Sequence, residues 1–311
     1  MMRRRDFIKG AAAGAIGFPS LLEAVGKDTS AEARQSELIS YWDRETELVS
    51  PKDYLAYQKD GDTRSFKALE ECERAFDKVV REVSRTVVTG DKPAIWSVYN
   101  MGYLVKTRKA LFSIDLRHRR DCELVPMLDF ALITHNHGDH WRRDFYRKMN
   151  EAGKLVMSNF LTDNAQFNKM KGASVKGVGT YRVKDVEIRT SLIDHFNQPW
   201  GIDFTMAYEM KIGDFRLYHT GDSGLGTVPK LNTVWGRPDL WLFFPGCGIN
   251  TPEAVKKVCA KRIVFGHLWE LEHLQAHRGR FDEALIRARL ADAKAAGCKD
   301  VSVAFWGDRI E

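Results

Sequence analysis

Cysteine is scarce in this sequence of 311 residues, and its spacing argues against one common kind of metal site. The five cysteines, Cys72, Cys122, Cys247, Cys259 and Cys298, form no Cys-x-x-Cys pair. Structural zinc sites built on cysteine use such closely spaced pairs, so we do not expect these thiols to bind a metal. Cys247 follows a strand-like run, where a small residue filling a tight turn is expected and a catalytic thiol is the alternative.

The sequence also has no long basic run and no internal repeat. Lysine and arginine number 48 against 42 aspartates and glutamates, and the formal net charge of +6 is spread along the chain. Nucleic acid is therefore not expected as a partner. The short basic tracts at residues 117–120, which include His118, and 142–143 are expected to be exposed. The second lies close enough to residues 135–140 to meet an anionic substrate.

The apolar stretch near the N-terminus is too short to span a membrane. It covers residues 10–22, about 13 residues where roughly 20 are needed, and it contains Pro19. Arg4 and Arg5 precede it, followed by Phe7, Ile8 and Lys9. This pattern is typical of a twin-arginine export signal, here residues 1–30, and a membrane anchor is the alternative. We therefore expect export by the twin-arginine translocase to a periplasmic or extracellular location.

Three of the nine histidines fall within six residues, in the segment Thr-His-Asn-His-Gly-Asp-His at residues 134–140. The segment follows the apolar run 130–133, which is typical of a buried strand that enters a loop. Alternate side chains of an extended segment share a face, so His135, His137 and Asp139 can converge on one ion. His140 then points elsewhere, toward a second ion. Imidazole nitrogens with a carboxylate oxygen suit zinc, manganese or iron.

The His-x-His-x-Asp-His pattern resembles the signature of the metallo-β-lactamase superfamily. His195, Asp222 and His267 match the later ligands of that family, in the expected order. The resemblance covers roughly residues 90–311 and includes an opening strand pair at residues 95–105. Residues 238–248 and the spacing are most similar to the branch of L-ascorbate-6-phosphate lactonase and N-acylphosphatidylethanolamine phospholipase D. The loop sequences depart from both enzymes, so neither substrate can be carried over.

The resemblance implies two bound divalent ions, with zinc expected and manganese or iron as alternatives. The first ion would be held by His135, His137 and His195, the second by Asp139, His140 and His267, and Asp222 would bridge both. Such a pair would generate a bridging hydroxide that attacks an ester, lactone, amide or phosphodiester of a small-molecule substrate. Asp139 would also orient the nucleophile and carry its proton, as a catalytic residue.

Two other functions are consistent with the same pattern. One is a mononuclear or di-iron redox enzyme of this fold, although flavodiiron proteins have glutamate where this chain has His137. The other is a metal-binding protein without turnover, which would usually have lost a ligand. The substrate, the oligomeric state and the signal cleavage site are not predicted by the sequence.

The expected architecture is an α/β protein with an αββα sandwich. Residues 89–311 would form the catalytic domain and residues 31–88 a helical N-terminal extension. Two helices are expected in the extension, with turn signals at Ser50-Pro51 and residues 59–62. Their apolar face would pack on the catalytic domain, and a homodimer contact is the alternative. A hairpin is expected around Gly213-Asp214, and helices are expected from Thr251 and over residues 282–296.

Several residues outside the ligand set are weaker candidates. His219 is expected to support a ligand carboxylate. His273 and His277 would share one face of a helix, either exposed or turned to a substrate or a third ion. Four loop residues near the ligands would either line the pocket or pack as ordinary loop side chains: Asn197, Trp200, Asn250 and Glu270.

Overall fold

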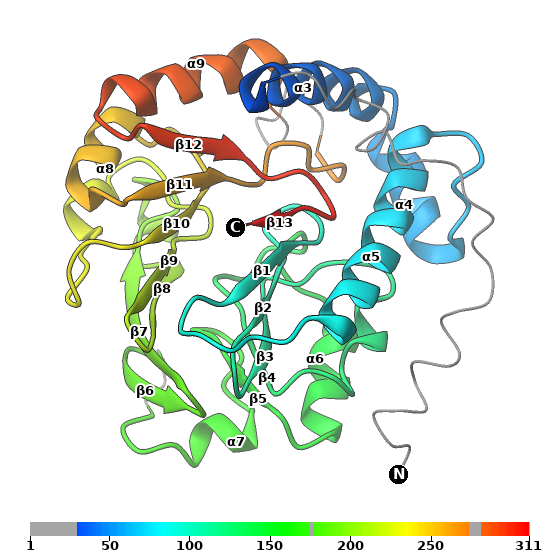
Figure 1. Cartoon of the computed structure of the whole chain (residues 1–311). Coiled ribbons are helices and arrows are strands. Elements are labelled where there is room, and N and C mark those ends of the chain that lie inside the picture. Colours follow the sequence, from blue (N-terminus) through cyan, green and yellow to red (C-terminus); the bar gives the residue numbers. More distant parts are fainter. Residues whose placement is uncertain (1–29, 174–176, 274–280, 311) are drawn as a thin grey trace.

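Two β-sheets face each other and helices cover their outer faces, so the predicted αββα sandwich is confirmed (Figure 1). The computed structural model describes residues 30–173, 177–273 and 281–310. The expected export signal, apart from Ser30, lies outside the described residues. The six-stranded sheet has the order β13 (Arg309–Ile310), β1 (Ala94–Ser97), β2 (Tyr103–Lys106), β3 (Leu111–Ile114), β4 (Phe130–Leu132) and β5 (Leu155–Met157).

The second sheet has seven strands and begins with parallel pairing. Its order is β12 (Asp300–Val303), β11 (Arg262–Phe265), β10 (Leu240–Phe243), β9 (Phe215–His219), β8 (Thr205–Ile212), β7 (Val186–Ile193) and β6 (Gly179–Val183). Strands β9 to β12 are parallel neighbours, and β10 is buried along its whole length. Burial on both faces explains why β10, with the sequence Leu-Trp-Leu-Phe, is a continuous apolar run. The expected hairpin between β8 and β9 is confirmed, with Gly213 at a φ of 57° in the turn.

Each sheet has its own helices. Helices α5 (Lys67–Arg85) and α6 (Arg143–Glu151) pack on the outer face of the first sheet, where Phe76 and Val79 join Trp96 and Phe145 in one cluster. Helices α8 (Thr251–Val258) and α9 (Glu283–Ala295) cover the second sheet (Figure 1). The short segments are α7 (Ala165–Asn168), η1 (Asp121–Glu123), η2 (Pro199–Gly201) and η3 (Val228–Lys230).

The N-terminal extension contains three helices, so the expectation of two was wrong. Helix α3 (Ala31–Glu47), α4 (Pro51–Asp60) and α5 follow one another. The chain turns at both predicted positions. The segment between them forms α4, because Ser50 and Asp53 make a reciprocal capping box. Gly61, at a φ of 79°, ends that helix.

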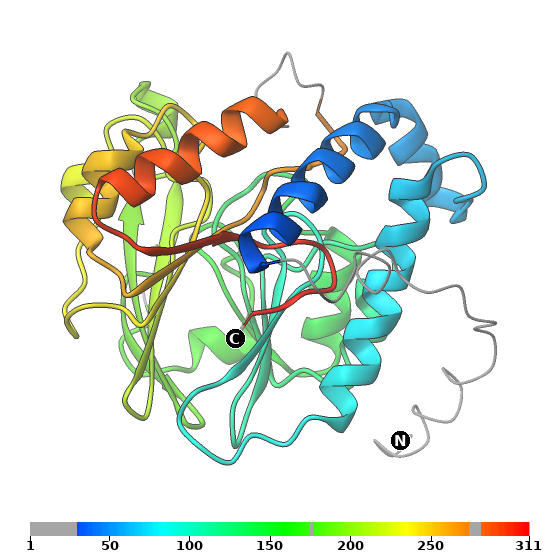
Figure 2. The same cartoon turned by 45° about the horizontal axis from the view of Figure 1, so that its top comes forward.

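The apolar face of the extension is covered by the rest of the same chain. Trp42 of α3 lies 4.5 Å from Trp306 and 6.1 Å from Trp269, measured between ring centroids. Helix α3 also contacts α9, because Ser40 Oγ donates to Glu283 Oε1 at 2.8 Å (Figure 2). The apolar face of the extension is therefore buried within this chain. A homodimer contact, which was the alternative, is not needed to bury it.

The basic tract at residues 117–120 is not an exposed edge, contrary to expectation. Arg120 forms ion pairs with Glu73 at 3.0 Å and Asp77 at 2.8 Å, both on α5, and Arg119 also pairs with Glu73. His118 is buried and stacks on Phe76 of α5 with ring centroids 4.2 Å apart. The tract therefore joins the extension to the first sheet.

The second basic tract also differs from the expectation. Arg142 Nη1 donates to the carbonyl oxygens of His118 at 2.8 Å and Arg119 at 2.7 Å. These bonds hold its guanidinium against the first basic tract, so Arg142 is not a freely exposed side chain.

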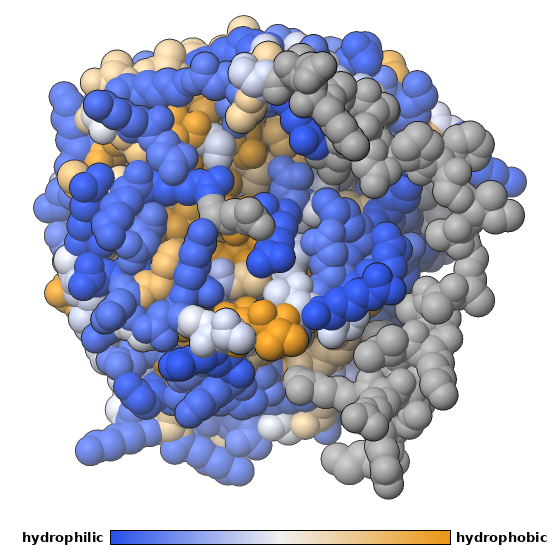
Figure 3. Space-filling view, in the orientation of Figure 1, coloured by the Kyte–Doolittle hydropathy of each residue, from blue (hydrophilic) through white to orange (hydrophobic). Residues whose placement is uncertain are grey.

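The face seen in Figure 1 is mostly hydrophilic, and hydrophobic side chains gather in its middle, between the two sheets (Figure 3). Within residues 30–173, 177–273 and 281–310, no helix combines the length and the apolar character needed to cross a bilayer.

Candidate metal centre

The seven predicted ligands lie on loops that follow strands from both sheets. The segment 135–140 follows β4, His195 follows β7, Asp222 follows β9 and His267 follows β11. Loops at strand ends can gather side chains from distant parts of a sequence. The structure brings all seven together as two adjoining groups, one of three histidines and one of two aspartates and two histidines.

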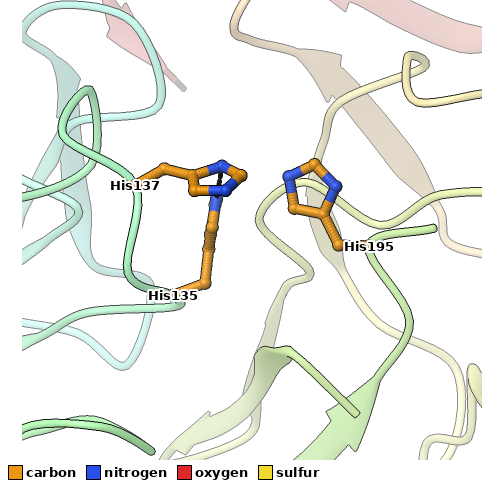
Figure 4. A group of neighbouring side chains, drawn as sticks. All are labelled: His135, His137 and His195. Carbon is orange, nitrogen blue, oxygen red and sulfur yellow. Dashed lines mark hydrogen bonds between the residues drawn. The ribbon is translucent and has the colours of Figure 1, made fainter. Parts of the chain in front are cut away.

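The first group consists of His135, His137 and His195. One nitrogen of each ring lies within 4.8 Å of the others, close enough to hold a single ion. Figure 4 shows the rings of His137 and His195 directed toward each other from opposite loops, with His135 beneath. Nε2 of His135 lies 3.1 Å from Nδ1 of His137, and Nδ1 of His135 lies 3.0 Å from Thr134 Oγ1. Thr134 therefore leaves the Nε2 atom of His135 directed at the group.

The second group consists of Asp139, His140, Asp222 and His267, all buried. His267 Nε2 lies 2.9 Å from Asp139 Oδ2 and 3.3 Å from Asp222 Oδ2. His140 Nε2 lies 3.2 Å from Asp222 Oδ1 and 3.4 Å from Asp139 Oδ2, yet it has no partner of hydrogen-bond geometry. Both carboxylates thus face both imidazoles, as donors around one cation do.

Unpartnered buried atoms show that these residues fit a metal. Both nitrogens of His195, Nε2 of His140 and Oδ1 of Asp222 are buried without a hydrogen-bond partner. Leaving such atoms unpaired costs about 1–3 kcal/mol each, so in native proteins they are normally bound to something. Imidazole and carboxylate donors in sets of three and four match zinc and related ions.

Burial keeps the three-histidine group neutral. Burial lowers the pKa of His137 and lowers that of His195 to about 4. Burial and the neighbouring His140 hold the pKa of His135 well below its usual value. These imidazoles are therefore unprotonated at neutral pH, the form in which histidine binds a metal.

The second group carries balanced charges instead. Burial would raise the pKa of Asp139 and Asp222, but His140 and His267 outweigh it and hold both pKa values well below the usual range. Burial would in turn lower the pKa of His267, yet Asp222 and Asp139 raise it to about 10. A divalent cation would take the place of the imidazole protons as the counter-charge to the two carboxylates.

Asp115 is a supporting residue that the sequence pattern did not reveal. It is fully buried after β3, and its Oδ2 atom lies 3.0 Å from His140 Nδ1. It also accepts hydrogen bonds of 2.7 Å from the backbone N–H and from Oγ1 of Thr134. His219 Nε2 lies 3.3 Å from the same Oδ2 atom. His219 therefore supports a carboxylate, as expected, but that carboxylate is Asp115 and not a predicted ligand.

Two further residues position the second group. Asn100 Nδ2 donates to Asp139 Oδ2 at 3.2 Å and fixes that carboxylate. Phe244 stacks on the ring of His267 with centroids 4.3 Å apart. His267 itself has a φ of 62°, a left-handed backbone conformation that residues other than glycine rarely adopt. Such conformations are typical of constrained functional positions.

Cys247 lies beside both groups, at the end of the strand-like run that precedes it, although none of the thiols was expected to bind a metal. Its Sγ atom, a nitrogen of His195 and an oxygen of Asp222 all lie within 4.8 Å of one another. The missing Cys-x-x-Cys spacing excluded a cysteine clamp but could not exclude one thiol supplied by a separate loop.

The weaker candidates have mostly structural roles. Asn250 Oδ1 accepts from Glu253 N at 3.3 Å and caps α8. Glu270 is buried, accepts from the backbone N–H of His273 at 2.8 Å and pairs with the His273 ring, which lies in a bend and not in a helix. Asn197 and Trp200 are exposed beside His195. His277 lies outside the described residues.

Solved structures share this fold at low sequence identity. No model of a protein family and no curated protein matches the sequence. The metallo hydrolase Igni18 from the archaeon Ignicoccus hospitalis is 17% identical over 70% of this chain and 97% of its own, with a TM-score of 0.52. An isothiocyanate hydrolase from Delia radicum gut bacteria is 14% identical over 71% of this chain and 99% of its own, with a TM-score of 0.51.

A weaker match is CmlA, a diiron β-hydroxylase from Streptomyces venezuelae, with 12% identity, coverage of 70% of this chain and 53% of its own, and a TM-score of 0.47. The two matches with TM-scores above 0.5 share their fold with this chain, and at 14–17% identity they leave its reaction open. Two facing sheets covered by helices, with histidines and aspartates gathered at the strand ends, agree with the αββα fold that the resemblance to the metallo-β-lactamase superfamily implied.

Proposed function

We propose that this protein is a metal-dependent hydrolase that holds two divalent cations, with zinc as the preferred metal. The observation that carries the proposal is the position of Asp222 between the two groups. Its Oδ1 atom faces His140 at 3.2 Å, and its Oδ2 atom faces His267 at 3.3 Å and His195 at 3.8 Å. One carboxylate that faces donors of both groups is suited to bridge two ions.

The side chains have separable tasks in this proposal. A bound divalent ion lowers the pKa of water toward 7 and polarises a carbonyl or phosphoryl oxygen. His135, His137 and His195 would hold the first ion, while Asp139, His140 and His267 would hold the second. Asp139, oriented by Asn100, would also accept a proton from the attacking water and pass it to the leaving group.

The substrate is proposed to be a small molecule with an apolar part next to the hydrolysed ester, lactone, amide or phosphodiester bond. Large apolar side chains are exposed on the loops beside the ligands: Trp200 is 62% exposed, Ile202 49% and Leu225 47%. Trp200 contacts Phe196 at 5.1 Å, and Phe196 contacts the ring of His195 at 4.2 Å, between ring centroids. A Trp200→Ala variant should raise KM for apolar substrates about tenfold without loss of metal.

The test is hydrolysis by protein that has been stripped with a chelator and reloaded with zinc, manganese or iron. A panel of esters, lactones, β-lactams, amides and phosphodiesters should yield a substrate whose turnover requires two ions per chain. Asp222→Ala should abolish that turnover and weaken metal retention while the far-ultraviolet circular dichroism stays unchanged. Full activity in Asp222→Ala would contradict the dinuclear mechanism. Turnover that requires iron and dioxygen would replace the hydrolase by the redox alternative.

We also propose that residues 1–30 direct export through the twin-arginine translocase. Arg4, Arg5 and the mild apolar stretch that follows support this proposal. Because this route carries folded proteins, the metals would be bound before export, in the compartment of synthesis.

A further inference from the structure

We infer that Cys247 supplies a thiolate ligand to the ion held by the three-histidine group, on the side shared by His195 and Asp222. The inference depends on the proposed metal binding and adds to it a ligand of different chemistry.

The backbone around Cys247 is fixed against the loops that carry the neighbouring ligands. Cys247 follows β10, and its carbonyl oxygen accepts from Leu225 N at 2.9 Å, three residues after Asp222. The adjacent Gly224 donates to the carbonyl oxygen of Asp194 at 2.8 Å, next to His195. A Cβ atom at Gly224 would collide with the His195 carbonyl oxygen, so glycine is required for this close approach. The three loops therefore hold the thiol and the two ligands together.

Both residues next to the thiol have buried atoms that make no hydrogen bond. His195 is 3% exposed, and neither of its ring nitrogens makes a hydrogen bond. Asp222 is 4% exposed and its Oδ1 atom is unpartnered. These buried atoms point to a cation independently of the thiol, and Cys247 Sγ lies within 4.8 Å of donor atoms of both residues. Among residues 30–173, 177–273 and 281–310, the other four cysteines belong to no such group.

A thiol that binds a metal must lose its proton. Burial raises the pKa of the Cys247 thiol, and the nearby Asp222 raises it further, so the free residue is a neutral thiol. Ligation would form one metal–sulfur bond and release one proton to solvent, with no change of oxidation state. A thiolate is a soft ligand, so the ion beside it should be zinc, cobalt or cadmium in preference to manganese or magnesium.

The experiment is optical spectroscopy of the full-length protein loaded with two equivalents of cobalt(II), which reports on sulfur ligation without an activity assay. The wild type should show an intense near-ultraviolet sulfur-to-cobalt charge-transfer band in addition to weak visible d–d bands. Cys247→Ser and Cys247→Gly should lose the charge-transfer band and keep the d–d bands. The glycine variant suits the backbone, because Cys247 has a φ of 51° and glycine adopts this conformation without strain.

Cys259→Ser is the matched control. Because Cys259 is exposed and lies outside the metal-binding groups, this substitution should leave both sets of bands unchanged. The preference for zinc over manganese should also fall about tenfold or more in Cys247→Gly. A charge-transfer band that survives in both Cys247 variants, or d–d bands without a charge-transfer band in the wild type, would overturn the inference and leave the proposed hydrolase intact. A wild type that binds no cobalt would overturn both.

Discussion

Asp115 is the side chain on which the orientation of His140 depends. One oxygen contacts Nδ1 of His140 at 3.0 Å, and Thr134 donates to both oxygens at 2.7 Å. A carboxylate in this place fixes the tautomer of the imidazole and directs its Nε2 atom toward the ion. The residue therefore acts on the metal centre through His140 and does not contact the metal position itself.

We expect Asp115→Asn to weaken binding of the second ion about 10–100-fold and to leave the first ion bound, because His140 is the one predicted ligand that contacts Asp115 directly. Zinc retained after dialysis against a graded chelator series measures this, with Asp214→Asn as a control on the exposed hairpin turn. Retention of both ions with wild-type affinity would show that Asp115 does not position His140.

The ligand residues were predictable from the sequence because four of them share one short segment and the others close strand-like runs. Asp115 and Asn100 were not predictable as parts of the site, because each meets it only through contacts between distant loops. Cys247 was expected only as a turn residue or, alternatively, as a catalytic thiol. Asn100 Nδ2, for example, donates to Asp139, 39 residues later in the chain. Contacts between residues so far apart in the chain produce no short sequence motif.

The basic tract 117–120 and helix α5 are joined by a network of ion pairs and hydrogen bonds. Glu73 accepts a 2.7 Å hydrogen bond from Tyr57 Oη and pairs with Arg119 and Arg120. The sequence predicted helices in this region from their apolar spacing. The packing of the basic tract beneath α5 was not predictable, because a short run of arginines has the same sequence whether it is packed or exposed.

Removing the Glu73 charge should loosen the extension. We expect Glu73→Gln to lower the free energy of unfolding by about 1–3 kcal/mol, because Arg119 and Arg120 lose their shared carboxylate in a mostly buried place. Urea denaturation measures the loss, and Glu70→Gln, exposed on the same helix, should change it by less than about 0.5 kcal/mol. Equal effects of the two substitutions would contradict this account of the contact.

His118 should make stability depend on pH. Burial lowers its pKa from 6.5 to about 3, with Arg120, Arg119 and Arg142 adding to the shift and Glu73 opposing it. Between these values the unfolded chain binds a proton that the folded chain does not, so stability falls as pH falls from 6.5 toward 3. The contribution is at most about 1.4 kcal/mol per pH unit.

We therefore expect His118→Gln to lose less stability than the wild type between pH 7 and the acid range, whatever its stability at neutral pH. Thermal unfolding over a pH series measures the slope for each protein. Parallel curves for the two proteins would show that His118 titrates normally and is not buried as described.

At the scale of the whole molecule, the proposed export signal can be tested separately from the enzyme. Replacing Arg4 and Arg5 by lysine preserves the positive charge but removes the paired arginines that the translocase recognises. In a bacterial host with this pathway, we expect the double variant to accumulate in the cytoplasm while the wild type is found in the periplasmic fraction. Equal export of both proteins would exclude the twin-arginine route.

The metal content of the protein is the first property to measure, because the two adjoining groups should each hold one ion. Elemental mass spectrometry on protein purified without chelators from the proposed export compartment gives the identity and number of bound ions. We expect two divalent ions per chain, chiefly zinc, and a clear loss of metal in Asp222→Ala, because the carboxylate between the groups is removed. A single ion, or none, in the wild type would contradict the dinuclear centre.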